Sequence, residues 1–283
     1  MIIAVTGSGG FVGKNLIAGL KSAGHTVVPI SRENGYDILD FKQLDKLPEF
    51  EVLIHLAAKN FVPESYDQPW DFYVFNFQST LNVLELCRKR KARFILFSSY
   101  LYGNPITVPI DESQKLDPHN PYAQSKLIAE ELAAGYQRDF NLPVIIFRPF
   151  NIYGSGQNEN YLIPKIIKNI HEREIYLNDP RPRRDFIFIA DVVSALKKAI
   201  AYLPAQLEII NLGYGESISI ADVANTIKSI FQSEVQIIFS EEIRKNEVMD
   251  TQCDNSKCRN LLGWEPEYSF AAGVLQMKQS MEN

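Results

Sequence analysis

The chain has 283 residues, 46% of them hydrophobic and 22% charged, with a formal net charge of -5. A chain of this length buries a sizeable core as one large domain or two smaller ones, without disulfide or metal staples. The composition is not that of a disordered, collagen-like or coiled-coil protein. The mild acidity argues against nucleic acid as a partner, because a phosphate-backbone footprint needs clustered Lys and Arg.

Membrane, secretion and metal signals are missing from the sequence. No apolar run reaches the roughly 18 residues of a membrane-spanning helix, and the first residues lead straight into glycines rather than into a signal-peptide core. Cys87, Cys253 and Cys258 are odd in number and badly spaced for a disulfide framework or a zinc site, and the four histidines are scattered. We expect reduced thiols, no metal, no membrane partner and a cytoplasmic location.

Short, continuous apolar runs alternate with segments of helical period through the first half of the chain. Such runs predict strands buried on both faces, as in a parallel sheet. The expected strands span 2–5, 26–30, 52–56, 94–97 and 144–147, and the expected helices include 11–23, 70–90 and 122–140. The alternation predicts an α/β fold, a doubly wound parallel sheet of the Rossmann type built from right-handed β-α units.

The first strand leads directly into a glycine-rich turn. Gly7, Gly10 and Gly13 have the spacing G-x-x-G-x-x-G, and a helical pattern begins at Phe11 and Val12. Glycines permit a tight strand-to-helix turn and let backbone N–H groups approach a pyrophosphate at the helix N-terminus. The strand before and the helix after the turn favour a dinucleotide site over a purely structural turn.

The second strand ends at Ser31 and Arg32, with Glu33 one step later. In a NAD site an acidic residue near this place binds the adenosine ribose, whereas an arginine and a hydroxyl suit the 2′-phosphate of NADP(H). We therefore favour NADP(H). NAD(H) remains the alternative, in which Arg32 is a solvated loop residue and Glu33 serves the ribose.

Tyr122 and Lys126 lie four residues apart, on one face of a helix. A phenol with a pKa of about 10 is a poor base at neutral pH, but a nearby ammonium and an oxidised nicotinamide stabilise its anion. Such a tyrosine gives or takes the proton of a carbinol or carbonyl oxygen while hydride moves at the nicotinamide. The lysine also suits the ribose hydroxyls.

The tyrosine–lysine spacing is weak evidence by itself, because Tyr161 and Lys165 repeat it with Pro164 between them. The first pair differs in what precedes it, a strand that ends at Ser98 and Ser99. A serine at the carboxyl end of a strand can hold a substrate oxygen against the tyrosine.

The pattern changes after about Gly154, where the loop-like stretch 154–160 precedes shorter and more mixed elements. We expect residues 1–154 to form the NAD(P)-binding domain, with segments near 184–203 returning to it. Residues 155–283 are then mainly a small α/β lobe that binds the substrate.

Together these features resemble the extended short-chain dehydrogenase/reductase family, in its group of nucleotide-sugar epimerases, dehydratases and 4-ketoreductases. The likeness covers nearly the whole chain, and the order and spacing of its motifs carry it. The matching stretches are 6–13, Tyr36-Asp37-Ile38, His55-Leu56-Ala57-Ala58, Asn76, 98–103, Tyr122 with Lys126, 148–154, Arg184-Asp185-Phe186, Asp191, Asn211-Leu212-Gly213 and 262–266.

The resemblance implies binding roles for residues outside the motifs above. It places Asp37 and Ile38 beside the adenine, and it lines the cofactor channel with Leu56, Ala57, Ala58 and Asn76. It assigns the substrate diphosphate to Asn151, and the diphosphate and ribose of a nucleotide sugar to Arg184 and Arg244. Arginine presents a rigid fork of donors that suits phosphate, although either arginine can also be a solvated surface charge.

Two departures from the family pattern limit which reaction of the family we expect. Tyr100 and Leu101 stand where the dehydratases carry an Asp-Glu pair, so we do not expect 4,6-dehydration. The short stretch between the second strand and Asp37 is more typical of 4-ketoreductases. Counting from the strand favours Ser99 as the catalytic hydroxyl, and counting back from Tyr102 favours Ser98; we assign Ser99 and expect both serines to contact substrate.

The leading hypothesis is an NAD(P)H-dependent reductase of a nucleotide-linked 4-keto-6-deoxyhexose, with hydride transfer at sugar C4. Ser99, Tyr122 and Lys126 are its expected catalytic residues. A 4-epimerase with a retained cofactor is the alternative, and a non-catalytic cofactor-sensing protein is disfavoured because the catalytic residues are kept. The resemblance also implies a homodimer paired through helices 70–90 and 122–140, unless these only pack on the sheet.

Overall fold

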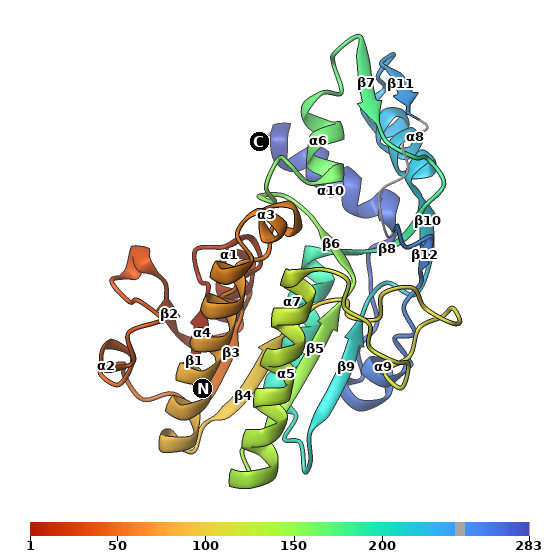
Figure 1. Cartoon of the computed structure of the whole chain (residues 1–283). Helices are drawn as coiled ribbons and strands as arrows, with labels where there is room; N and C mark the ends of the chain where they lie inside the picture. Colours follow the sequence, from red (N-terminus) through yellow and green to blue (C-terminus); the bar gives the residue numbers. More distant parts are fainter. Residues whose placement is uncertain (241–246, 283) are drawn as a thin grey trace.

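The computed structural model describes residues 1–240 and 247–282, and a six-stranded parallel sheet organises the first half of the chain (Figure 1). The strand order is β2-β1-β3-β4-β5-β9. The strands are β1 (Ile2–Thr6), β2 (Thr26–Ile30), β3 (Val52–His55), β4 (Arg93–Phe97), β5 (Val144–Pro149) and β9 (Glu208–Leu212). All five predicted strands lie in this sheet, and β9 joins it from the second half of the chain.

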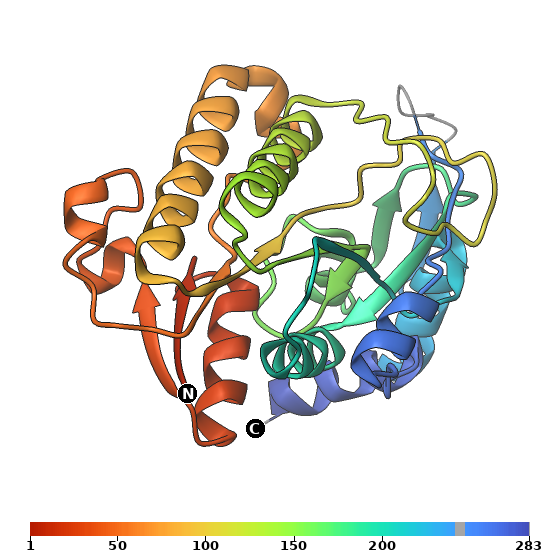
Figure 2. The ribbon, with the colours of Figure 1, turned by 90° about the horizontal axis from the view of Figure 1, so that it is seen from below.

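Helices cover both faces of the sheet (Figure 2). One face carries α1 (Phe11–Ser22) and α7 (Ile189–Ala201), and the other carries α4 (Pro69–Arg90) and α5 (Pro121–Phe140). The two long helices each begin at a proline, which suits the first helical position because its missing N–H has no helical partner there. Separate apolar clusters fill the two interfaces. The predicted doubly wound sheet is confirmed.

An irregular connection joins β2, at the edge of the sheet, to β3. It contains η1 (Arg32–Asn34) and α2 (Phe41–Leu44), and α3 (Val62–Asp67) follows β3. The strand order reverses between β1 and β3, and a parallel sheet binds ligands at such a point, outside the carboxyl ends of its strands. The glycine turn and the expected cofactor channel start from these two strand ends.

Smaller sheets occupy the second half. β8 (Arg183–Phe188) pairs with β6 (Asn151–Tyr153), β10 (Ser217–Ser219) and β12 (Asp250–Thr251), while β7 (Glu174–Leu177) pairs with β11 (Gln236–Phe239). The remaining helices are α6 (Leu162–Lys168), α8 (Ile220–Phe231), α9 (Ser256–Leu262) and α10 (Phe270–Glu282). Within the stretch 184–203, α7 packs against α1 of the main layer, whereas β8 belongs to a smaller sheet. The division into domains stays a prediction.

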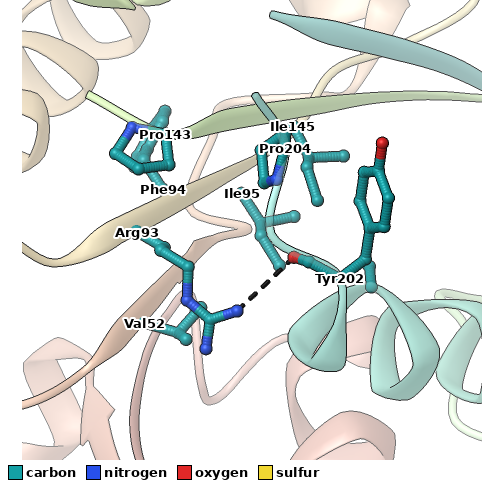
Figure 3. A pocket seen from close by; sticks show the side chains of 9 residues that line it. Val52, Arg93, Phe94, Ile95, Pro143, Ile145, Tyr202 and Pro204 are labelled. Carbon is teal, nitrogen blue, oxygen red and sulfur yellow. Dashed lines mark hydrogen bonds between the residues drawn. The ribbon is translucent and has the colours of Figure 1, made fainter. Parts of the chain in front are cut away.

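A small hollow opens at the amino ends of the strands, lined among others by Val52 and Arg93 (Figure 3). The Arg93 guanidinium donates to the backbone oxygens of Ile200 at 2.7 Å and Tyr202 at 3.4 Å, so the protein's own groups occupy it. A ligand crevice in such a sheet is expected at the opposite edge.

None of the described helices has the length and apolar character needed to cross a bilayer. Within residues 1–240 and 247–282, no group of three or more His, Cys, Asp or Glu side chains is arranged to hold a metal ion. Cys87, Cys253 and Cys258 are buried and unpaired, and burial raises the pKa of the Cys258 thiol to about 12.

Candidate active site

The glycine turn packs directly against the residues that follow β3. Gly7 has a φ of +63°, and a Cβ there would lie 2.8 Å from the backbone nitrogen of Ala57. A Cβ at Gly13 would collide with the carbonyl oxygen of Gly7. These two positions therefore require glycine, one for its backbone conformation and both for the close approach.

The rest of the turn closes on itself and opens α1. The Gly10 N–H donates to the Gly7 carbonyl at 3.0 Å, and Phe11 and Val12 begin the helix and pack against the buried core. The Phe11 ring also lies beside Gly154, from the second half of the chain. A glycine turn that opens a helix in this way presents backbone N–H groups at the helix N-terminus, which suits a pyrophosphate.

The end of β2 is tied to the glycine turn by Asn34, which sequence patterns did not single out. Asn34 Oδ1 accepts hydrogen bonds from Ser31 Oγ at 2.6 Å and from Ser8 Oγ at 3.2 Å. The carboxylate of Glu33 lies against Gly9, where a Cβ would be 2.9 Å from Oε2. Arg32 is exposed, and its side chain makes no hydrogen bond or ion pair with the described residues. Arg32 and Glu33, the two candidates for binding the adenosine ribose or its 2′-phosphate, are therefore neighbours in η1, which contacts the glycine turn through Glu33 and Asn34.

The adenine-side residues belong to the connection between β2 and β3. Asp37 Oδ1 accepts from the Leu39 N–H at 3.0 Å. Ile38 is buried, and its carbonyl accepts from Asn82 Nδ2 on α4 at 2.9 Å. These contacts hold the connection against the body of the protein, at the side of the crevice where the resemblance expects adenine.

The channel after β3 is shaped by side-chain hydrogen bonds to its backbone. Leu56, Ala57 and Ala58 leave the strand, and Asn76 on α4 grips the next residue, Lys59: its Oδ1 accepts from the Lys59 N–H at 2.9 Å and its Nδ2 donates to the Lys59 carbonyl at 3.1 Å. Asn76 Nδ2 also donates to Ser125 Oγ on α5 at 2.8 Å. Both amide hydrogens of Asn76 are thus used within the protein, and the residue fixes the wall of the channel.

The start of α5 aims its first turn at the end of β4. Asn120 caps the helix by accepting from the Ala123 N–H at 2.8 Å, ahead of Pro121. One residue later, the Tyr122 hydroxyl shares a hydrogen bond with Ser99. Lys126, a turn further along, is buried and donates from Nζ to the carbonyl of Phe97 at 2.7 Å. The structure thus brings together the three residues predicted to be catalytic.

Burial sets the protonation of this group. It raises the pKa of Tyr122 to about 12, an increase that the hydrogen bond from Ser99 opposes. It lowers the pKa of Lys126 to about 8, against the attraction of Glu130. At neutral pH the phenol is therefore protonated and the ammonium is largely charged, so the pair is set to donate a proton.

Ser98 has a different environment from Ser99. Its N–H donates to the Phe147 carbonyl at 2.8 Å within the sheet. Its Oγ is buried and has no hydrogen-bond partner among the described residues. A buried hydroxyl left unpaired at the carboxyl end of a central strand fits a ligand that supplies the missing partner.

The predicted phosphate ligands lie on the second-half side of the crevice. Asn151 Nδ2 donates to the Asp185 carbonyl at 3.1 Å. Arg184 forms an ion pair with Glu247 and donates to the Val248 carbonyl at 2.5 Å. Burial raises the pKa of Tyr100, and the nearby Arg184 opposes that rise, which puts Arg184 on the side of β4. Arg244 lies outside the described residues.

Tyr161 is a site neighbour that the sequence analysis set aside with the second tyrosine–lysine spacing. Its ring packs edge-on against Phe61, with centroids 6.2 Å apart. Burial raises the pKa of Tyr122, and charge on Tyr161 raises it further, so the two phenols lie within electrostatic reach of each other. Its contact with Phe61, far away in the sequence, brings this tyrosine to the site. The sequence around Tyr161 carries no such signal.

Comparison with known proteins identifies the family. Residues 3–213 match the model of the NAD dependent epimerase/dehydratase family. A GDP-6-deoxy-D-mannose reductase of Pseudomonas aeruginosa is 31% identical, over 99% of this chain and 96% of that protein. A putative UDP-glucose 4-epimerase of Methanocaldococcus jannaschii is 30% identical, over 100% of this chain and 99% of that protein. The solved structure of RMD from Pseudomonas aeruginosa complexed with NADPH has a TM-score of 0.91 at 28% identity, covering 99% of this chain and 98% of that one.

These matches span both halves of the chain and agree with the glycine turn, the parallel sheet and the crevice at its carboxyl edge. They confirm the resemblance to extended short-chain dehydrogenases/reductases. The chain belongs to the NAD-dependent epimerase/dehydratase family and is an enzyme that works with a nicotinamide cofactor.

Proposed function

We propose that the protein is an NAD(P)H-dependent reductase of a nucleotide-linked 4-keto-6-deoxyhexose. The contact between Tyr122 and Ser99, beside Lys126 at the end of β4, carries this proposal. The bound dihydronicotinamide would supply hydride to C4 of the sugar. Tyr122 gives its proton to the ketone oxygen, so that hydride and proton together convert the ketone to a secondary alcohol.

The neighbouring side chains have separate tasks in this step. Ser99 donates a hydrogen bond to the same oxygen and holds it against Tyr122. The Lys126 ammonium stabilises the phenolate that remains, and its two N–H groups not bound to Phe97 are available to ribose hydroxyls. Ser98, Asn151, Arg184 and Arg244 are the proposed contacts to the rest of a nucleotide sugar.

Three observations support reduction over the other reactions of the family. No carboxylate follows Ser99, because Tyr100 and Leu101 occupy the next positions, and Tyr100 donates to the Gly103 carbonyl at 2.8 Å. The stretch between the end of β2 and Asp37 is short. A reductase is among the relatives at 31% identity. A 4-epimerase is the second candidate, favoured by the relative of that name; it would use the same groups in both directions of hydride transfer.

The deciding experiment incubates the purified enzyme with a panel of nucleotide sugars and their 4-keto derivatives. Consumption of NADPH with formation of a 4-hydroxy sugar is expected. Isomer formation without net cofactor change identifies the epimerase instead. Tyr122→Phe keeps the ring and removes the proton, so turnover should fall at least 100-fold while cofactor binding stays intact; near-wild-type turnover in that variant contradicts the catalytic assignment.

We propose NADP(H) as the preferred cofactor, because the exposed Arg32, which has no hydrogen bond or ion pair with the described residues, follows β2 directly. The next two residues, Glu33 and Asn34, contact the glycine turn. Arg32→Ala should weaken NADPH about tenfold or more and NADH little, since a charge-assisted bond to the 2′-phosphate is lost. Glu33→Gln is the matched variant: it removes the carboxylate against Gly9 and should weaken only NADH. Equal effects of Arg32→Ala on the binding of NADPH and NADH contradict the proposed preference for NADP(H).

The homodimer and the cytoplasmic location are part of the same proposal. α4 and α5 pack closely against each other, and α4 keeps exposed aromatic side chains on its outer face. The three unpaired cysteines agree with a reducing compartment.

A further inference from the structure

A chain of buried hydrogen bonds runs through His55, between the first strand and α4. His55 Nδ1 lies 2.8 Å from Thr6 Oγ1, and Nε2 lies 3.2 Å from Thr80 Oγ1. Thr80 Oγ1 donates to the carbonyl of Asn76 at 2.7 Å. All four residues are at most 2% exposed. The network is shielded from bulk solvent, so we assign its protons from the hydrogen-bonding groups of the protein.

The surroundings of Thr6 determine which groups donate and which accept in this hydrogen-bond network. Thr6 Oγ1 accepts from the N–H groups of Leu56 and Ala57, both at 3.1 Å. A hydroxyl has two acceptor positions and one hydrogen. Both acceptor positions are therefore occupied, and the hydroxyl hydrogen points to His55 Nδ1. A proton on Nδ1 would face a filled acceptor, so Nδ1 is the unprotonated nitrogen.

The other ring nitrogen then carries the proton. The Thr80 hydroxyl uses its own hydrogen on Asn76, so it accepts from His55 Nε2–H. A charged imidazole would need a second acceptor that Thr6 does not offer. Burial, followed by the charge of Lys126, also keeps the pKa of His55 well below its ordinary value.

The two ends of this hydrogen-bond network, at Thr6 and at Asn76, contact different parts of the site. Thr6 anchors the backbone of Leu56 and Ala57, against which Gly7 packs. Asn76 holds Ser125, whose hydroxyl donates to the Tyr122 carbonyl at 2.7 Å. We propose that His55 is a positioning residue which, as the neutral imidazole protonated on Nε2, holds the cofactor channel and the catalytic helix in register. It has no contact with the reacting atoms.

Nitrogen-15 NMR of the histidine-labelled full chain tests the protonation state without any substrate. The His55 signals are assigned by their loss in His55→Gln. One protonated nitrogen, Nε2, and one unprotonated nitrogen, Nδ1, are expected, unchanged between about pH 5 and 8, although free histidine titrates near about 6.5. A proton on Nδ1, or titration in that range, overturns the proposal. This result is independent of the proposed reaction.

Cofactor binding tests the positioning role. His55→Phe leaves the Thr6 hydroxyl hydrogen without an acceptor and removes the donor to Thr80 Oγ1. It should weaken NADPH by about tenfold, the factor expected for one lost buried hydrogen bond. His55→Gln offers an acceptor and a donor at similar spacing and should recover most of this loss. The exposed His171→Phe is the matched control and should bind as the wild type. Wild-type affinity in a folded His55→Phe protein overturns the role.

Thr80 supplies a second route if His55→Phe does not fold. Thr80→Val keeps the shape and removes the acceptor of Nε2–H, and Thr80→Ser retains it. Weaker NADPH binding in the valine variant, with wild-type binding in the serine variant, supports the positioning role of the hydrogen-bond network. Equal affinity in both, with only the melting temperature lowered in the valine variant, shows a purely structural contact and overturns the positioning role.

Discussion

At the end of β4 two adjacent hydroxyls stand in different surroundings. Ser99 shares a hydrogen bond with Tyr122, whereas Ser98 Oγ is buried and unpaired. Successive side chains of an extended segment point to opposite sides, so one residue of register decides which serine meets the substrate oxygen. Sequence counting from the strand and from Tyr102 gave opposite answers, and the contact to Tyr122 favours Ser99.

The two serines should separate in kinetics. Ser99→Ala should lower kcat on the order of 100-fold, as the loss of one donor to a developing oxyanion does. Ser98→Ala should mainly raise KM, by about tenfold, because it removes one hydrogen bond to bound substrate. Steady-state rates of both variants check the assignment, and the opposite pattern would make Ser98 the catalytic hydroxyl.

Lys126 should set the alkaline limit of the reaction. Its pKa is lowered by burial to about 8, so the ammonium is present below that pH and is lost as the pH rises through it. Because Tyr122, with a pKa of about 12, keeps its proton in this range, we expect kcat/KM to fall above about pH 8. A pH profile of kcat/KM for the wild type measures this alkaline fall. Arginine stays charged in this pH range, so the residual activity of Lys126→Arg should not fall above about pH 8. If that variant still shows the fall in kcat/KM, another group is responsible for it.

At the scale of the element, α5 is held by more than its packing on the sheet. Glu130 accepts from Arg148 of β5 at 2.7 Å, and both side chains are almost fully buried. Arg148 also donates to Tyr102 Oη at 3.0 Å, and Tyr102 donates to Asn211 Oδ1 at 2.6 Å. The helix that carries Tyr122 is thereby tied to β5, to β9 and to the loop after β4.

Removing one partner of this buried pair should be costly. Glu130→Ala leaves the Arg148 charge uncompensated and should lower the free energy of unfolding by about 3–5 kcal/mol. The neighbouring Glu131 is exposed, so Glu131→Ala should change it by less than about 0.5 kcal/mol. Urea denaturation of the two variants makes the comparison, and equal, small losses in both would contradict the structural importance of the pair.

At the scale of the whole molecule, the site lies where two layers of different construction meet. The parallel sheet supplies the ends of β1, β3 and β4, and the smaller sheet around β8 supplies Asn151 and Arg184. Phe11 against Gly154 and Phe61 against Tyr161 cross from one half to the other. On the far side, α4 shows Trp70, 76% exposed, with Val74 and Phe77 along the same helical face.

The exposed face of α4 should be covered by a second copy of the chain. A row of large apolar side chains at helical spacing is costly to leave in water, and the family resemblance pairs these helices across a two-fold axis. We expect a homodimer in light scattering, and a monomer for Trp70→Asp combined with Phe77→Asp. Tyr176→Asp, at an exposed position of β7, is the control and should stay dimeric. A monomeric wild type at micromolar concentration refutes the pairing.

Features that depend on neighbouring residues could be predicted from the sequence. The strands, the glycine turn and the spacing of Tyr122 and Lys126 follow from local periodicity and local backbone geometry, because both act within a few positions of the chain. The fold class and the proposed catalytic pair could therefore be predicted from the sequence.

Only the tertiary structure decided contacts between residues far apart in the chain. The addition of β9 to the main sheet, the approach of Tyr161 to Tyr122, the bridge of Asn34 to the glycine turn and the proton direction at His55 all depend on segments brought together by burial of the core. Local patterns carry no record of such pairings, since the free energy that selects them comes from packing the whole sheet and both helical layers at once.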